Sequence, residues 1–121
     1  MHFQLTDEQR MIQDLAREFA DREIVPVAAQ ADRDQVFPLP IHRKALELGL
    51  LNLEVPEALG GAGLGALEVA LVTEQLCRGC LGIGAALSIS ALAAEPILVA
   101  GTPDQQLSLI HISEPTRPLY I

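Results

Sequence analysis

Two cysteines three positions apart are the residues of this chain whose spacing most directly suggests chemistry. Cys77-x-x-Cys80 matches half of a zinc site or a redox-active pair. A zinc site needs four ligands, and the three histidines, His2, His42 and His111, are scattered along the chain. The pair also lacks the neighbouring βαβ pattern of a thioredoxin-like motif. We therefore interpret both cysteines as core residues at the end of an apolar helix and assign no metal ligand.

A glycine-rich run is the second candidate for chemistry. Gly61, Gly63 and Ala66 match the relaxed dinucleotide fingerprint G-x-G-x-x-A, in which backbone amides bind a pyrophosphate at the start of a helix. The fingerprint requires a strand directly before it, but Pro56 and a four-residue gap separate the glycines from the only candidate strand, residues 51–55. We interpret the run as a connector whose glycines adopt positive φ angles and assign no cofactor-binding residue.

Carboxylates form close pairs, Asp32 with Asp34 and Glu54 with Glu57, in segments that read as loops. This placement favours a solvated surface over general acid–base catalysis, so we assign no catalytic residue. The whole chain has 8 Lys and Arg against 16 Asp and Glu, a net charge of −8. Such a charge repels nucleic-acid phosphates, which excludes nucleic acid as a partner.

The length and composition of the chain are consistent with one small domain. Its 121 residues are 50% apolar, which is enough for a single helical core. The first eight residues lack the basic and continuous apolar regions of a secretory signal. We therefore expect a cytoplasmic protein.

The first helix is predicted from its capping residues. Thr6 and Gln9 have the spacing of a capping box, and apolar residues at steps of three to five over 11–24 give one buried face. Pro26 removes a backbone donor, so the helix must stop there or continue through a kink. We expect a kink with continuation to Ala31, because the alanines after the proline favour a helix.

Helical period also dominates the rest of the chain, and no period-two strand of convincing length is present. A loop is expected over residues 32–38, before the next helix. The predicted helices cover 40–48 with Gly49 as a left-handed cap, 65–78, and 81–100, and a further one begins after Thr102. The fold class is therefore all-α, a helical bundle.

Residues 81–101 have one charge and almost the length of a bilayer span. Glu95, Pro96 and the many small residues argue against insertion, as does the lack of basic flanking residues beyond Arg78. Small residues also suit a helix packed on all sides inside a bundle. We predict no membrane span, and keep as the alternative a small helical membrane-anchored or interaction protein with residues 81–101 as its anchor.

Four motifs between residues 3 and 106 carry a family resemblance. They are Thr6-x-x-Gln9 with Ile24-Val25-Pro26, Glu47-Leu48-Gly49-Leu50-Leu51, the loop from Val55-Pro56-Glu57 to Gly65, and Gly79-Cys80-x-Gly82. Together they resemble the amino-terminal helical domain of the acyl-CoA dehydrogenases, most closely the medium-chain members. Two further domains, a β-domain and a four-helix bundle, follow this domain in that family.

The resemblance implies an oxidoreductase of fatty acid β-oxidation that converts acyl-CoA thioesters to trans-2-enoyl-CoA. It also implies FAD as cofactor, an electron-transferring flavoprotein as electron acceptor, and a homotetramer. In the family, the catalytic glutamate and the main flavin contacts belong to the later domains. The chain is then a truncated acyl-CoA dehydrogenase that is inactive alone and supplies one wall of the acyl pocket.

The same resemblance implies which residues form that wall. Gly84, Ser88 and Leu92 match the acyl-contacting positions of the family, and their i, i+4, i+8 spacing puts them on one helical face. Gly84 and Ser88 are smaller than the residues of the medium-chain pattern. We expect the extra room to admit acyl chains of at least medium length, unless neighbouring side chains fill the space.

Residues 107–121 differ in composition from the alanine-rich sequence before them. The stretch from Leu107 to Arg117 resembles the translation of a sequencing adapter. We therefore predict a native domain over residues 1–106 and a non-native read-through tail over 107–121.

Overall fold

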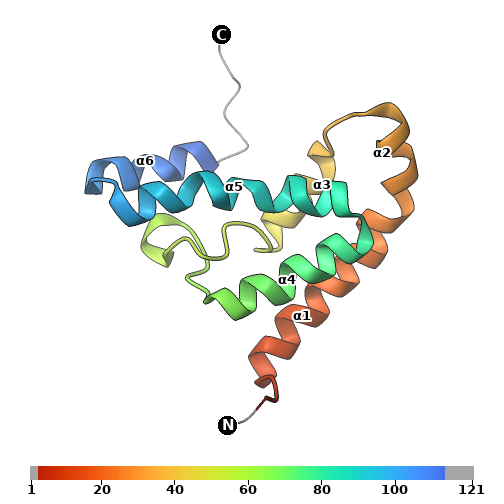
Figure 1. Ribbon diagram of the computed structural model, residues 1–121, viewed down its shortest axis with the longest axis horizontal. Helices are drawn as coiled ribbons and strands as arrows, with labels where there is room; N and C mark the ends of the chain where they lie inside the picture. The colour runs from red at the N-terminus through yellow and green to blue at the C-terminus, as the bar shows by residue number, and fades with distance from the viewer. Residues whose placement is uncertain (1–2, 114–121) are drawn as a thin grey trace.

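The computed structural model describes the backbone of residues 3–113 and the side chains of residues 3–108. No strand occurs within these bounds, and the all-α prediction is confirmed (Figure 1). His2, the His111 side chain and residues 114–121 of the predicted tail lie outside the described part. The elements are α1 (Asp7–Phe19), η1 (Ala20–Ile24), η2 (Val25–Val27), α2 (Ala28–Asp34), α3 (Leu39–Glu47), η3 (Glu57–Leu59), α4 (Ala66–Gly79), α5 (Leu81–Ala100) and α6 (Pro103–Ser113).

The predicted capping box starts α1. The Gln9 backbone amide donates to the Thr6 hydroxyl at 3.2 Å, and the Thr6 amide donates to Gln9 Oε1 at 2.9 Å. Gln9 also uses its side-chain amide, which donates to Glu68 Oε1 of α4 at 2.7 Å. The Gln9 side chain thus accepts a hydrogen bond from a backbone amide at the N-terminus of α1 and joins this helix to α4.

The kink predicted at Pro26 is confirmed, and its geometry is a change of helical pitch. Residues Ala20–Ile24 form a π turn, closed by a hydrogen bond from the Val25 amide to the Ala20 carbonyl, and a 3-10 turn follows over Val25–Val27. A π turn widens the backbone just before the proline ring, which would otherwise crowd the preceding turn. The chain changes direction here and continues as α2 (Figure 1).

The loop predicted over residues 32–38 begins three residues too early. Asp34 still belongs to α2, because its carboxylate accepts a hydrogen bond from the Gln30 side-chain amide at 2.6 Å one turn earlier. Gln35, with φ 50°, adopts the left-handed conformation that ends the helix. The connection to α3 is therefore only four residues long.

The end of α3 confirms the predicted cap at Gly49. Its φ is 70°, its amide donates to Leu46, and the Leu50 amide donates to Ala45 at 2.9 Å. These two bonds are the Schellman pattern, which reverses the chain at the glycine. Leu50, which is 2% exposed, is thereby turned directly into the core.

α4 lies at the centre of the packing, with α1 along one side and α5 crossing the other (Figure 1). Its inward residues, Val72 and Leu76, meet Phe19 of α1 and Leu87 of α5 in the main core. Gln75, also buried, accepts hydrogen bonds from Arg17 at 3.4 Å and Arg78 at 3.2 Å. The main core consists of Ala16, Phe19, Ala20, Ile24, Ile41, Ala45, Leu50, Leu51, Leu53, Val72, Leu76, Ile83 and Leu87.

α5 occupies the predicted residues 81–100, but the expectation that it is packed on all sides is wrong within the described structure. Only 22% of its most apolar window is buried. α4 and α6 both contact it, on different sides (Figure 1), and the Thr102 hydroxyl caps the start of α6 as predicted. A stripe of α5 that includes Leu81, Ile89, Leu92 and Val99 stays exposed within the described structure.

Candidate functional site

The three residues expected to contact an acyl chain lie along the edge between the covered and open sides of α5. Gly84 is buried, Ser88 is half-buried, and Leu92 is 68% exposed. The three positions turn progressively outward, since successive residues four apart rotate around the helix by about 40°. They therefore share one strip of α5, but not one environment.

Gly84 is the closest approach between α5 and α4. A Cβ atom at this position would lie 2.7 Å from both the backbone nitrogen and the sulfur of Cys77. The space left by the missing side chain is thus filled by Cys77. The expected extra room for a longer acyl chain is not present at Gly84, and only Ser88 still supports that expectation.

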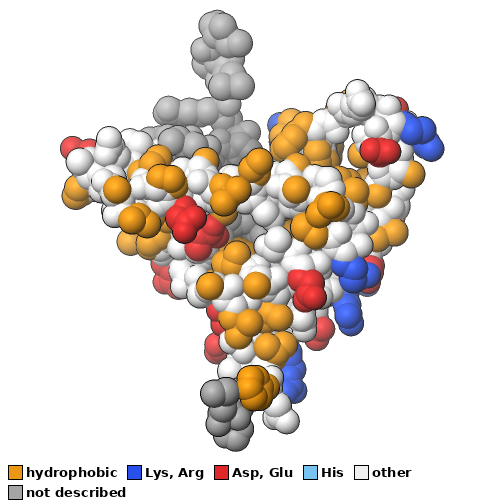
Figure 2. Space-filling view, viewed as in Figure 1, with side chains coloured by type: hydrophobic (Ala, Val, Ile, Leu, Met, Phe, Trp, Pro, Cys, Tyr) orange, Lys and Arg blue, Asp and Glu red, His pale blue; other side chains and the backbone are white. Residues whose placement is uncertain are grey.

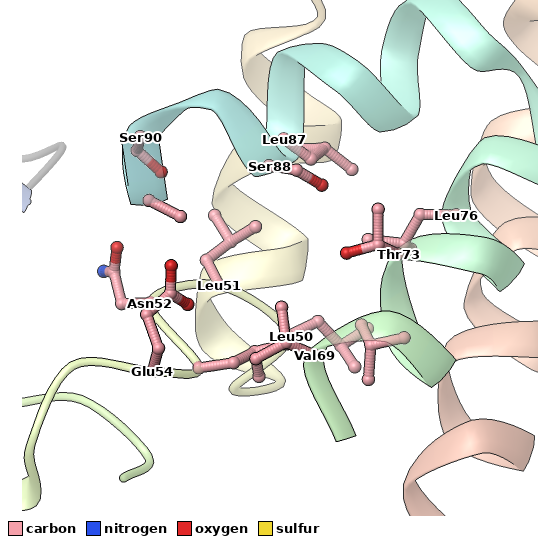
Figure 3. Close-up of a pocket in the computed structure, with 13 residues that line it drawn as sticks. Leu50, Leu51, Asn52, Glu54, Val69, Thr73, Leu76, Leu87, Ser88 and Ser90 are labelled. Atoms are coloured by element: carbon pink, nitrogen blue, oxygen red, sulfur yellow. The ribbon is translucent and has the colours of Figure 1, made fainter. Parts of the chain in front are cut away.

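The Ser88 hydroxyl is bonded within α5. It donates to the Gly84 carbonyl at 2.9 Å. It also lines an internal cavity of about 50 Å³ between α5, α4 and residues 50–54. Figure 3 shows Ser88 and Thr73 extending from α5 and α4 toward this same space.

This cavity is too small for an acyl chain. Ser90, Asn52 and Glu54 add oxygen atoms to its lining beside Leu51 and Leu87. A water molecule needs only about 10–15 Å³ of such a cavity and several polar partners. The cavity therefore suits a few waters.

The outer side of α5 is apolar along its whole length. We call this surface the outer face and define it by Leu81, Ala85, Ile89, Leu92, Pro96 and Val99, all of which are exposed. The spacing of 4, 4, 3, 4 and 3 keeps them on one stripe. Glu95 is the only ionisable residue of the helix. Figure 2 shows apolar side chains scattered along the length of α5 in this view.

The glycine-rich loop is a connector, as predicted, and its amides are already bonded. The amides of Gly61 and Gly63 donate to the carbonyls of Pro56 and Val55 at 3.2 and 2.9 Å. A Cβ on Gly61 would overlap the Val55 carbonyl, and Gly63 has φ 62°. Because these donors are used within the loop, the fingerprint does not fit a pyrophosphate.

Both cysteines are half-buried rather than fully in the core. Burial raises the pKa of the Cys77 thiol, and a charge on Cys80 would raise it further. Among the described residues, no group of three or more His, Cys, Asp or Glu side chains is placed to hold a metal ion. The structure thus places both cysteines next to Gly84, one of the three residues expected to contact an acyl chain.

One structural residue and one contact were missed in the sequence. Gln75 accepts hydrogen bonds from Arg17 and Arg78, and its position one turn after Leu71, on the buried face of α4, could have indicated this role. The contact of Cys77 with Gly84 had no local signal, because it depends on the crossing of two helices.

The comparisons with known proteins agree with this architecture. Residues 6–111 match the family model described as acyl-CoA dehydrogenase, N-terminal domain. An acryloyl-CoA reductase (NADH) of Anaerotignum propionicum is 39% identical over 106 residues, 88% of this chain and 27% of that protein. The mitochondrial short-chain specific acyl-CoA dehydrogenase of Rattus norvegicus is 39% identical over 85% of this chain and 25% of its own length.

Solved structures give the same result. A chain from the structure described as the electron transferring flavoprotein of Acidaminococcus fermentans matches with a TM-score of 0.80 and 33% identity, over 91% of this chain and 29% of that one. Butyryl-CoA dehydrogenase from Megasphaera elsdenii matches with a TM-score of 0.76 and 28% identity, over 91% of this chain and 30% of that one. The chain spans about a quarter of the length of the curated relatives it matches. It belongs to the acyl-CoA dehydrogenase family, through the N-terminal domain of that family.

Proposed function

We propose that the chain is the acyl-wall domain of an FAD-dependent acyl-CoA dehydrogenase. The whole enzyme would oxidise acyl-CoA thioesters to trans-2-enoyl-CoA as a homotetramer and pass electrons to an electron-transferring flavoprotein. The family match over residues 6–111 supports the reaction class. When bound, FAD would accept the hydride. The glycine-rich loop does not fit its pyrophosphate, so no described residue is assigned to the flavin.

The observation that carries this proposal is the outer face of α5. Leu81, Ile89, Leu92 and Val99 are between 62% and 80% exposed on one 20-residue helix. An apolar surface of this length is unfavourable in water and typically marks a binding or docking surface. Leu92 within this face presents carbon atoms, which suits the tail of an acyl chain and offers nothing to its thioester.

The same helix supports the alternative, a membrane anchor, less well. Leu81–Ala100 is long and apolar enough to cross a membrane, with a mean hydropathy of 1.8. Its inner side, however, packs Ile83 and Leu87 into the main core, against Leu76 of α4. Withdrawing α5 into a bilayer would expose that part of the core to water. The packing therefore favours a helix of a folded domain.

A chimaera tests the proposal. Residues 1–106 replace the matching N-terminal segment of the rat short-chain specific acyl-CoA dehydrogenase, and enoyl-CoA formation is measured with a series of saturated acyl-CoA thioesters. We expect turnover and retained flavin. A chimaera that binds flavin as the parent does, yet oxidises no thioester in the series, would contradict the role as acyl wall.

Two surface variants of the chimaera provide the matched comparison. Ile89→Glu places a charge in the outer face, and we expect loss of assembly and activity. Met11→Glu places the same charge on α1, where Met11 is 69% exposed, and we expect activity to be kept. Equal behaviour of the two variants would show that the outer face has no role. Separately, partition of the 121-residue chain into membranes rather than the soluble fraction would favour the anchor.

We further propose that residues 107–121 are read-through and that the native domain ends near Gln106. The support for this proposal is the adapter-like sequence alone. The structure gives no boundary at Gln106, because α6 continues to Ser113. Sequencing the gene beyond codon 106 tests this. Continuation into a β-domain and a helical bundle is the expected result, and a stop after codon 121 in genomic DNA is the contrary one.

A further inference from the structure

The cysteine pair is not used by the proposed function, yet the structure gives its two members different surroundings. Cys77 lies in the last turn of α4 against Gly84, and its pKa is raised first by burial. Cys80 lies between α4 and α5, and its amide still bonds the Leu76 carbonyl at 3.3 Å. Both side chains are half-buried, and Cys80 is the one that lines an opening.

That opening is a groove of about 530 Å³ between α2, the connection after it and the start of α5. Its walls include Phe37 and Val36 on one side and Cys80, Ile83 and Ala86 on the other. The groove is hollow because small residues line it where larger side chains would fill it. A reagent of the size of a tripeptide disulfide can therefore approach Cys80 from the groove, whereas Cys77 is not part of the groove lining.

We propose that Cys77 and Cys80 form a thiol–disulfide exchange site that reacts with low-molecular-weight disulfides through Cys80. The Cys80 thiolate attacks one sulfur of oxidised glutathione, forms a mixed disulfide in the groove and releases one glutathione. The Cys77 thiolate then attacks the Cys80 sulfur, forms the Cys77–Cys80 bond and releases the second glutathione. The protein dithiol loses two protons and two electrons, and one glutathione disulfide is reduced to two thiols.

The spacing of the pair permits this bond after a small local movement. Residues three apart in a helix have Cβ atoms about 5–6 Å apart, and a disulfide needs about 3.8 Å. Cys80 has an extended backbone, φ −165° and ψ 122°, between two helices, and its rotation would strain its hydrogen bonds with Leu76 and Gly84. The bond would draw the Cys77 sulfur away from Gly84. Oxidation would therefore change the packing of α5 against α4.

The test uses the whole 121-residue chain in glutathione redox buffers, with free thiols blocked before intact-mass measurement. We expect the wild type to lose both thiols together and to become lighter by two hydrogens. Cys77→Ser should stop at one glutathione adduct on Cys80. Cys80→Ser should react at Cys77 at least about tenfold more slowly, since that thiol lies outside the groove and burial raises its pKa.

Denatured samples and hydrogen exchange complete the experiment. In urea the two single-cysteine variants should react at equal rates, which assigns the native difference to the fold. The Gly84 amide, which donates to the Cys80 carbonyl at 2.8 Å, should exchange faster in the oxidised wild type than in the reduced one. Two independent glutathione adducts on the wild type, or equal native rates for the two variants, would overturn the proposal.

Discussion

Replacing Gly84 by alanine tests the tightest contact of the candidate site. The added Cβ would meet the backbone nitrogen, the Cα atom and the sulfur of Cys77 at 2.7–2.8 Å. Backbone atoms cannot move aside as a side chain can, so α4 and α5 must separate. Overpacking of this kind costs about 1–3 kcal/mol, and alanine regains about 1 kcal/mol of helix propensity. We expect a net loss of up to about 2 kcal/mol.

Gly82 provides the matched control, because it lies in the same helix and nothing lies within 4 Å of its added Cβ. Gly82→Ala should gain up to about 1 kcal/mol from propensity alone. The assay is thermal and urea unfolding of the 121-residue chain, followed by circular dichroism. The two variants differ by the overpacking cost of about 1–3 kcal/mol, which at about 4 °C per kcal/mol is roughly 4–12 °C in Tm. If Gly84→Ala is as stable as Gly82→Ala, the close crossing of α4 and α5 is refuted.

Three further predictions concern the rest of the domain. Thr6→Ala removes the capping hydroxyl and should cost about 1 kcal/mol in urea unfolding, whereas an unchanged midpoint would show that the cap is unimportant. The hydrogen bond from Gln9 holds the pKa of Glu68 below its ordinary 4.5. The ionised Glu68 therefore stabilises the fold above that pH, and this stabilisation is lost as the pH falls through the folded-state pKa. The free energies of unfolding of wild type and Glu68→Gln, measured against pH, should therefore converge in acid. A difference in unfolding free energy that stays constant with pH would contradict this. Gly61→Ala should prevent the loop from closing on Val55, and a wild-type Tm would refute that packing.

Much of the fold could be predicted because its signals are local. The capping box at Thr6, the kink at Pro26 and the left-handed cap at Gly49 each depend on a few neighbouring residues, and each was found where expected. The end of α2 was misplaced because the side-chain bond from Gln30 to Asp34 extends the helix beyond what propensity indicates.

The candidate site was less accessible to sequence reasoning. The i, i+4, i+8 spacing correctly placed Gly84, Ser88 and Leu92 along one strip of α5. It could not show that Cys77 fills the space at Gly84, since that depends on how two helices cross. Nor could composition distinguish a helix covered all round from one that keeps an exposed stripe, because both are apolar throughout.

The bonding of the glycine-rich loop affects how this domain can be cut or extended. Glycine-rich segments are ordinarily the places where a chain accepts an insertion or a protease. Here the amides from Gly61 to Leu64 all donate to carbonyls of residues 52–56, so opening the loop would sacrifice several hydrogen bonds at once. The four-residue connection after α2, with Val36 66% exposed, has no such constraint. A new terminus or an inserted tag therefore belongs beside Val36, not among the glycines.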